Sequence, residues 1–265
     1  MSLAYCTLLS GSGGNSAYIE SGTDAVLLDA GASGRELFRL LAVQELDPDR
    51  LRGILVTHEH SDHVRGVGVV ARRLNLPVYA TAGTWRGMER AVGPLPDHLV
   101  RVVRTGEAFS VGTLTVTPVP LSHDTLEPCG YVVEAEGSRV AFVTDTGVLT
   151  EEAFRLASRA DGLVIEANHD TGMLMHGPYP YFLKRRILGD TGHMSNEYCG
   201  TILKELVGER TRHVLLAHLS RENNLPDLAL AEIRRCLAGH RLTVSVAPRS
   251  HPHPLIRLDG QKEAL

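Results

Sequence analysis

Residues 54–66, with the sequence ILVTHEHSDHVRG, bring three histidines and two acids into one short tract. Imidazole and carboxylate groups are common ligands of divalent cations, so the tract indicates a metal site. The pair His58-Glu59 begins like the zinc-protease motif H-E-x-x-H, but position 62 is an aspartate, which excludes that motif. The pattern that remains is H-x-H-x-D-H, formed by His58, His60, Asp62 and His63.

The local chain geometry can bring these four side chains together. Residues two apart in an extended segment point the same way, so His58 and His60 can share a metal just beyond the apolar run that precedes them. If Ser61 caps a helix, Asp62 and His63 lie in its first turn and face the same cleft. The tract then supplies parts of two metal sites. The alternative is a solvated, histidine-rich turn.

Three further donors follow apolar runs of strand character: His123 in VPLSHD, Asp145 in FVTDTG and His218 in VLLAHLS. Loops at strand ends are where rigid scaffolds place functional groups. Each of the three, taken alone, is more often a structural residue than a ligand. Together with the H-x-H-x-D-H tract they form a coherent set of seven candidate metal ligands.

Strands and helices must position these donors. Strands are predicted at Ala4–Leu9, Ser16–Ile19, Ala25–Asp29, Gly53–Thr57, Pro77–Ala80, Leu114–Pro118, Gly130–Glu134, Val140–Thr144, Gly162–Ile165, His213–Ala217 and Leu242–Ala247. Helices are predicted at Gly34–Leu41, His63–Arg73, Thr84–Ala91, Glu151–Ala157, Asn196–Val207 and Asp227–Leu237. Because several strands follow one another with only turns between them, mixed or antiparallel sheets with outer helices are favoured over a purely parallel sheet.

The composition is that of a globular α/β protein. The chain of 265 residues is 43% hydrophobic and 22% charged, so it can bury a sizeable core. No long linker divides it, and candidate ligands come from both halves, so residues 1–265 are expected to form a single domain. The net charge of −4 gives no overall field that favours nucleic acid, so an anionic substrate must be held locally.

The cysteines and the N-terminal segment predict the compartment. Cys6, Cys129, Cys199 and Cys236 form no C-x-x-C pair, which argues against a disulfide framework and favours a reducing compartment. The N-terminus lacks a basic region followed by a long apolar run, and no apolar run approaches the roughly 18 to 20 residues that span a membrane. We therefore expect a cytoplasmic protein with no membrane partner.

The ordered series LLDAG, THEHSDH, LSHD, TDTG and LAHLS resembles the five motifs of the metallo-β-lactamase superfamily of hydrolases. The resemblance implies an α/β fold, a four-layer αββα sandwich with a dinuclear metal centre at one edge of its sheets. By this resemblance one metal is bound by His58, His60 and His123, the other by Asp62, His63 and His218, and Asp145 bridges them. Asp29, at the end of the LLD run, would hold a ligand imidazole in place.

Two divalent cations held in this way favour hydrolysis. They lower the pKa of a shared water, which makes hydroxide available as a nucleophile, and they polarise an oxygen of the substrate. True β-lactamases of the superfamily usually carry a cysteine where this chain has Asp145. A carboxylate suits a bridged pair of harder ions, Zn²⁺ or Mn²⁺, and β-lactam turnover is not expected.

Glu166 and His193 point to the bond that is cut. Glu166 ends a predicted strand, and His193 lies in GHMSN, just before a predicted helix. The pair resembles the Glu and His of the tRNA 3′-processing nucleases of the superfamily. By that resemblance His193 binds the scissile phosphate or protonates the leaving oxygen, and Glu166 fixes its tautomer, which makes these two residues and Asp62 the candidate catalytic residues. The alternative is that His193 is only part of a helix cap.

Further residues near these motifs are candidate substrate contacts. Ser195 is expected to cap a helix whose free N–H groups favour an anion. The Lys184-Arg185-Arg186 run could neutralise phosphates or could be a solvated helix face, and the aromatic residues in Pro178–Tyr181 could stack on bases or pack in the core. The full set of candidate substrate contacts is Ser195, Asn196, Lys184, Arg185, Asn168, His169, Asn223 and Asn15.

The finer motifs SGSGGNS, EANHD, GHMSN and LAHLSRENN are similar to those of the WalJ (YycJ) group of bacterial 5′→3′ DNA exonucleases. The leading hypothesis is therefore a two-metal phosphodiesterase that acts on nucleic acid, specifically DNA. The first alternative is a thioesterase or lactonase that acts on a small metabolite. RNA processing is disfavoured, because the chain has no long Gly- or Pro-rich arm. An inactive metal-binding module is disfavoured because every ligand is present.

Overall fold

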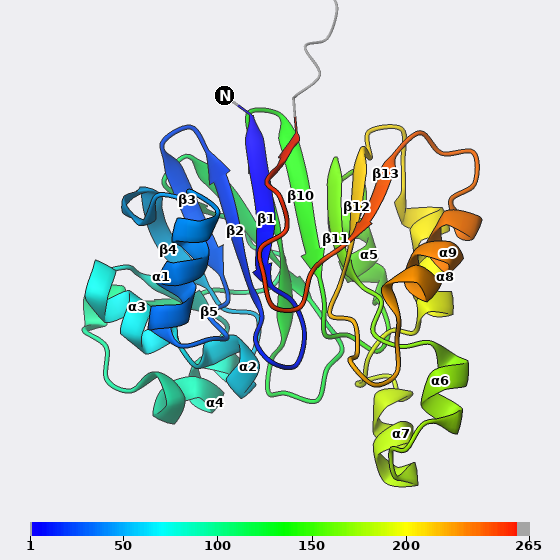
Figure 1. The fold of residues 1–265 in the computed structure, drawn as a ribbon. Helices are drawn as coiled ribbons and strands as arrows, with labels where there is room; N and C mark the ends of the chain where they lie inside the picture. The colour runs from blue at the N-terminus through cyan, green and yellow to red at the C-terminus, as the bar shows by residue number, and fades with distance from the viewer. Residues whose placement is uncertain (1, 259–265) are drawn as a thin grey trace, which may run out of the picture.

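The computed structural model describes residues 2–258 as two seven-stranded sheets that face each other (Figure 1). Sheet A has the order β14-β1-β2-β3-β4-β5-β6. Its strands are β14 (Ile256–Leu258), β1 (Leu3–Leu9), β2 (Ser16–Ser21), β3 (Asp24–Leu28), β4 (Leu51–Leu55), β5 (Val78–Ala80) and β6 (Val100–Val102). The pairs from β14 to β3 are antiparallel and those from β3 to β6 are parallel, so the sheet is mixed.

Sheet B repeats this arrangement with the order β13-β12-β11-β10-β9-β8-β7. Its strands are β13 (Thr243–Val246), β12 (His213–Ala217), β11 (Gly162–Glu166), β10 (Ser138–Val143), β9 (Cys129–Ala135), β8 (Leu114–Pro120) and β7 (Phe109–Val111). The pairs from β7 to β10 are antiparallel, and those from β10 to β13 are parallel. The mixed sheets predicted from the sequence are therefore confirmed.

The strands read as continuous apolar runs because both faces of each sheet are buried. In β1, Leu3 and Tyr5 pack between the two sheets, whereas Cys6 and Leu8 pack under the helices outside sheet A. A third apolar cluster fills the space between sheet B and its own helices. The result is the four-layer αββα arrangement, with helices on the two outer faces (Figure 1).

Three of the helices begin at the predicted residue and two within two residues of it, whereas the helices over Thr171–His176 and Tyr181–Ile187 are not predicted from the sequence. The helices are α1 (Gly34–Val43), α2 (Ser61–Val64), α3 (Val67–Leu74), α4 (Ala82–Val92), α5 (Glu151–Ala157), α6 (Thr171–His176), α7 (Tyr181–Ile187), α8 (Asn196–Leu206) and α9 (Pro226–Cys236). Two short 3₁₀ turns lie at Pro48–Arg50 and Asp97–Leu99. Ser195 caps α8 as predicted, because its side chain accepts a hydrogen bond from the N–H of Tyr198.

Two local predictions are wrong. The helix predicted over His63–Arg73 is broken, because Gly66 lies against the loop that follows β3: its N–H donates to Ala30, and a Cβ there would lie 2.3 Å from the carbonyl oxygen of Ala32. Ser61 is not a cap, since the helix α2 begins at Ser61 itself and is preceded by His60, whose side chain makes no capping bond. Within residues 2–258 no helix is long and apolar enough to cross a membrane.

Candidate metal centre

The loops that carry the candidate ligands meet at one shared edge of the two sheets, the edge near α2 and α7 in Figure 1. Sheet A brings His58 to His63 in the loop and short helix after β4, and Asp29 directly after β3. Sheet B brings one residue each from the ends of β8, β10 and β12, namely His123, Asp145 and His218. The parallel register of β3 with β4 and of β10 to β12 is what places these strand ends side by side.

Three of these residues share an unusual backbone conformation. Asp29, Asp145 and His218 have φ values of +55°, +60° and +55°, and each follows a strand within two residues. Residues other than glycine seldom adopt positive φ, and such strain concentrates at functional sites. The same sharp turn at the end of three different strands directs three polar side chains to the shared sheet edge.

The structure brings all seven candidate ligands into one cluster. The ligand atoms of His58, His60 and His123 lie within 4.8 Å of one another, and so do those of Asp62, His63 and His218. Asp145 contacts both groups: its ligand oxygen lies within 4.8 Å of the ligand nitrogens of His58 and His63, and its Oδ1 is 3.3 Å from His218 Nδ1. The arrangement has two triads of donors with one shared carboxylate.

Unpartnered polar atoms show that the cluster fits a cation. His123 Nε2, His218 Nε2 and Asp145 Oδ2 are buried, and none has a hydrogen-bond partner among the described residues. A buried polar atom without a partner costs roughly 1–3 kcal/mol, so three at one place call for a compensating group. Nitrogen and carboxylate oxygen donors are a set that suits Zn²⁺ and similar divalent ions. The residues present therefore fit a divalent metal.

The imidazole rings are packed against one another. The ring centroid of His58 lies 4.0 Å from that of His63 and 5.1 Å from that of His123. Burial, together with the neighbouring imidazoles, holds the pKa of His58 well below its usual range. His58 is therefore neutral near pH 7, which is the protonation state that binds a metal.

Asp29 holds one side of the cluster. Its buried carboxylate accepts hydrogen bonds from Thr57 N (2.8 Å), Thr57 Oγ1 (2.9 Å) and His63 Nδ1 (2.8 Å). The bond to Nδ1 turns Nε2 of His63 toward Asp62 and Asp145. Asp29 thus lies where the sequence predicts, beside a candidate ligand imidazole. Thr57 was not singled out from the sequence, because a lone threonine before a histidine carries no distinguishing pattern.

Glu166 holds the other side of the cluster. Its side chain is fully buried, and Oε1 accepts from both His193 Nδ1 and His218 Nδ1 at 2.8 Å, while Oε2 accepts from the N–H groups of Thr146 (3.1 Å) and Met194 (3.2 Å). Burial alone would raise the pKa of Glu166, but the two imidazoles outweigh it and hold the pKa well below the usual range. The carboxylate is therefore ionised, and its Oε1 fixes the orientation of two imidazoles.

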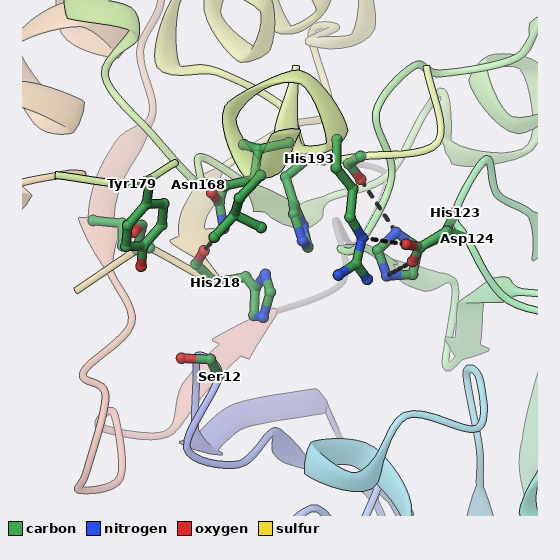
Figure 2. Close-up of a pocket in the computed structure, with 13 residues that line it drawn as sticks. Ser12, His123, Asp124, Asn168, Tyr179, His193 and His218 are labelled. Atoms are coloured by element: carbon green, nitrogen blue, oxygen red, sulfur yellow. Dashed lines mark hydrogen bonds and ion pairs between the residues drawn. The ribbon is translucent and has the colours of Figure 1, made fainter. Parts of the chain in front are cut away.

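A cavity of about 200 Å³ lies beside the cluster, and we call it the α7 cavity because α7 forms one of its walls (Figure 2). His123 and His218 face it from the cluster, and His193, which shares Glu166 with His218, faces it as well. Tyr179 and Arg186 line it from the chain around α7. Figure 2 shows Tyr179 at one end of the cavity and His123 with Asp124 at the other, with His193 and His218 between them.

Some of the candidate substrate contacts lie at the cluster or the α7 cavity, and others do not. Asn15 touches the cluster, because its Nδ2 is 3.2 Å from Asp62 Oδ2 and 2.9 Å from His63 Nε2. Asn168 lines the α7 cavity and donates to the carbonyl oxygen of His218. Arg185 is exposed and does not line that cavity, whereas its neighbour Arg186 does.

Five other candidates lie outside the lining of the α7 cavity. Asn196 is 1% exposed and pairs with Asn224, and Lys184 Nζ donates to two backbone carbonyl oxygens. Asn223 is fully buried, and Ser195 uses its hydroxyl to cap α8. His169 is 1% exposed, and neither ring nitrogen has a partner among the described residues. None of these five side chains (Asn196, Lys184, Asn223, Ser195 and His169) lines the α7 cavity.

Helices outside two mixed sheets, with a histidine and aspartate cluster at the shared edge, form the metallo-β-lactamase fold. The metallo-β-lactamase fold protein YhfI from Bacillus subtilis superposes with a TM-score of 0.72 over 96% of this chain and 99% of its own, at 16% identity. Residues 24–219 match the family model of the β-lactamase superfamily domain.

Two curated relatives narrow the family. Exodeoxyribonuclease YycJ of Bacillus anthracis is 39% identical over 95% of both chains. Exodeoxyribonuclease WalJ of Streptococcus pneumoniae is 38% identical over 91% of both chains. The chain therefore belongs to the β-lactamase superfamily and, within it, to the family of these two relatives.

Proposed function

We propose that this protein is a metal-dependent 5′→3′ DNA exonuclease that hydrolyses phosphodiester bonds. The observation that carries the proposal is the shared carboxylate of Glu166, which holds His193 at the α7 cavity and His218 in the ligand cluster. A group that acts on a leaving oxygen is thereby fixed beside the candidate metal ligands. The names of the two curated relatives, both exodeoxyribonucleases, support DNA as the substrate.

The seven ligands would hold two divalent cations, Zn²⁺ or Mn²⁺. His58, His60 and His123 would bind one, Asp62, His63 and His218 the other, and Asp145 both. Such a pair activates water and stabilises charge on a phosphoryl oxygen. We further propose that residues 1–265 act as one domain, since the ligands come from both sheets, and that the protein acts in the cytoplasm, since its four cysteines are free.

His193 has a defined task in this proposal. Because Nδ1 donates to Glu166, the ring presents Nε2 to the α7 cavity, where it can bind the scissile phosphate or deliver a proton to the leaving 3′ oxygen. The net charge of −4 means that attraction of DNA must come from local cations. Arg186 is the one Lys or Arg side chain among the residues that line the α7 cavity.

The test is cleavage of single-stranded and duplex DNA, labelled at the 5′ end or at the 3′ end, by protein loaded with Mn²⁺ or Zn²⁺. We expect stepwise release of nucleotides, with a loss of at least about a hundredfold in His58→Ala and Asp145→Ala, because even residues that merely support metal ligands are worth 10–100-fold. His240→Ala, which removes an exposed histidine outside the cluster, should cleave normally. Metal-loaded protein that leaves DNA intact but hydrolyses acyl-thioesters would replace the proposal with the thioesterase alternative.

A further inference from the structure

The segment between β11 and α8 projects beyond the sheet edge as the helices α6 and α7 (Figure 1). None of the residues in α7 is fully buried, so this helix adds little to the cores of the protein. Leu183, Arg186 and Ile187 are spaced i, i+3 and i+4 and therefore share one face of α7, and all three line the α7 cavity. The face of α7 is thus matched to the cavity rather than to a core.

Tyr179 is held in place at one end of this cavity. It lies between Pro178 and Pro180, whose rings fix the backbone torsion φ on either side. Lys184 Nζ donates to the carbonyl oxygens of Met175 and Gly177 at 2.8 Å each, which ties α7 to the end of α6. The half-buried aromatic ring is therefore presented to the cavity in a preset position (Figure 2).

Arg186 is held near the metal-ligand cluster. Its Nε donates to Asp124 Oδ2 at 2.5 Å, and Asp124 Oδ1 lies 3.5 Å from His123 Nε2 and 3.8 Å from His60 Nε2. The side chain is 58% exposed, and its terminal N–H groups donate to no other described residue. A guanidinium that is oriented by one carboxylate and has free donors is suited to bind a phosphate.

The ligand that matches these walls has a flat ring joined to a phosphate. Tyr179 offers a stacking face, Leu183 and Ile187 are apolar, and Arg186 lies nearer the cluster where a phosphate would be cut. We infer that the α7 cavity binds the single unpaired nucleotide at the end of a DNA strand, with its base on Tyr179 and its phosphate at Arg186. A base inside a duplex is stacked on its neighbours and paired with the other strand, so the end of the strand must be single-stranded or frayed to enter the α7 cavity.

This inference rests on the proposed function, but binding of a mononucleotide tests it without cleavage. The probe is 2′-deoxyadenosine 5′-monophosphate, titrated calorimetrically into the metal-loaded protein, with inorganic phosphate as the comparison ligand. Tyr179→Ala should lower the affinity for the nucleotide about tenfold, which corresponds to the loss of roughly 1.4 kcal/mol of stacking. The affinity for inorganic phosphate should stay unchanged. Tyr179→Phe should keep the wild-type affinity, because a phenyl ring stacks as well.

Two further variants complete the design. Tyr181→Ala is the matched control, because Tyr181 is 73% exposed, lies two residues away and does not line the α7 cavity, so nucleotide binding should be unchanged. Arg186→Gln should lower the affinity for the nucleotide and for inorganic phosphate by a similar factor. On DNA, Tyr179→Ala should raise KM for a 5′-tailed duplex more than it lowers kcat.

The outcomes separate the two proposals. The proposed nucleotide site is wrong, even when DNA is cleaved, if Tyr179→Ala binds the nucleotide as tightly as the wild type. It is also wrong if the variant's affinity for phosphate falls as much as its affinity for the nucleotide. If nucleotide binding depends on Tyr179 but no DNA is cleaved under any metal, the site stands and the exonuclease proposal is wrong.

Discussion

At the scale of single residues, Glu166 is the most constrained group near the candidate centre. Each of its two carboxylate oxygens accepts two hydrogen bonds, one pair from imidazoles and the other from backbone N–H groups. A carboxylate can accept all four, since both oxygens are acceptors. A glutamine amide cannot accept all four, because its NH₂ group would replace one oxygen and would face two N–H donors.

Glu166→Gln should therefore damage positioning while it keeps the shape of the side chain. Two of the four donors lose their acceptor, at a cost of about 2 kcal/mol or more in the free energy of unfolding. We expect metal affinity or kcat on DNA to fall 10–100-fold, measured by metal titration and by cleavage. Glu205→Gln, an exposed glutamate on α8, is the matched control. Wild-type metal affinity, rate and stability in Glu166→Gln would contradict the positioning role.

The sequence predicted some residue positions better than others. His58, His60, Asp62 and His63 were expected to lie together because local geometry alone brings residues two apart in an extended loop, and those of a helix first turn, to one side. The link from Glu166 to His218 joins residues 52 apart in sequence, and no local pattern could predict it. It follows from the parallel pairing of β11 with β12.

At the scale of elements, Asp24 ties the two sheets together away from the candidate centre. Asp24, at the start of β3, accepts from Arg52 Nε at 2.8 Å and from the N–H of Thr113 at 2.9 Å. Thr113 lies in the turn between β7 and β8 of the other sheet. That turn needs Gly112, which has φ +59° and a Cβ position only 2.5 Å from Asp24 Oδ2.

Gly112→Ala should destabilise the protein more than a matched glycine substitution. Gly137, in the turn between β9 and β10, has φ +75° and open space around its Cβ position, so Gly137→Ala carries only the backbone strain of about 1–2 kcal/mol. Gly112→Ala adds the clash with Asp24, and we expect at least about 1 kcal/mol more, measured by urea unfolding. Equal losses in the two variants would show that the Asp24 contact is unimportant.

Elements escaped prediction where packing gave no pattern in the sequence. The strands β6, β7 and β14 are three residues long and lie at sheet edges, which is too short for an apolar alternation to stand out. No residue of α7 is fully buried, so it lacks the apolar stripe that marks a core helix. By contrast, β12 and α5 were predicted with their observed limits. In β12 all five residues are buried, and α5 is capped by Thr150.

At the scale of the whole molecule, the candidate centre joins the two sheets. His58 to His63 come from sheet A, whereas His123, Asp145 and His218 come from sheet B. A metal bound across this edge binds the folded state more tightly than the unfolded chain, because only the folded state brings the sheet B ligands to the tract His58 to His63. Binding therefore adds directly to the free energy of unfolding, by an amount set by metal concentration and affinity.

Removal of metal by a chelator should lower Tm, and the loss should depend on the sheet B ligands. At a metal concentration about a hundred times Kd the contribution is about 2.7 kcal/mol, or roughly 5–10 °C in a chain of this size. Differential scanning calorimetry with and without chelator measures it, with metal content checked by elemental analysis. In His218→Ala the chelator should change Tm far less, because sheet B then supplies fewer ligands, whereas His240→Ala should respond like the wild type. An unchanged Tm after complete removal of bound metal would mean that the metal does not link the sheets.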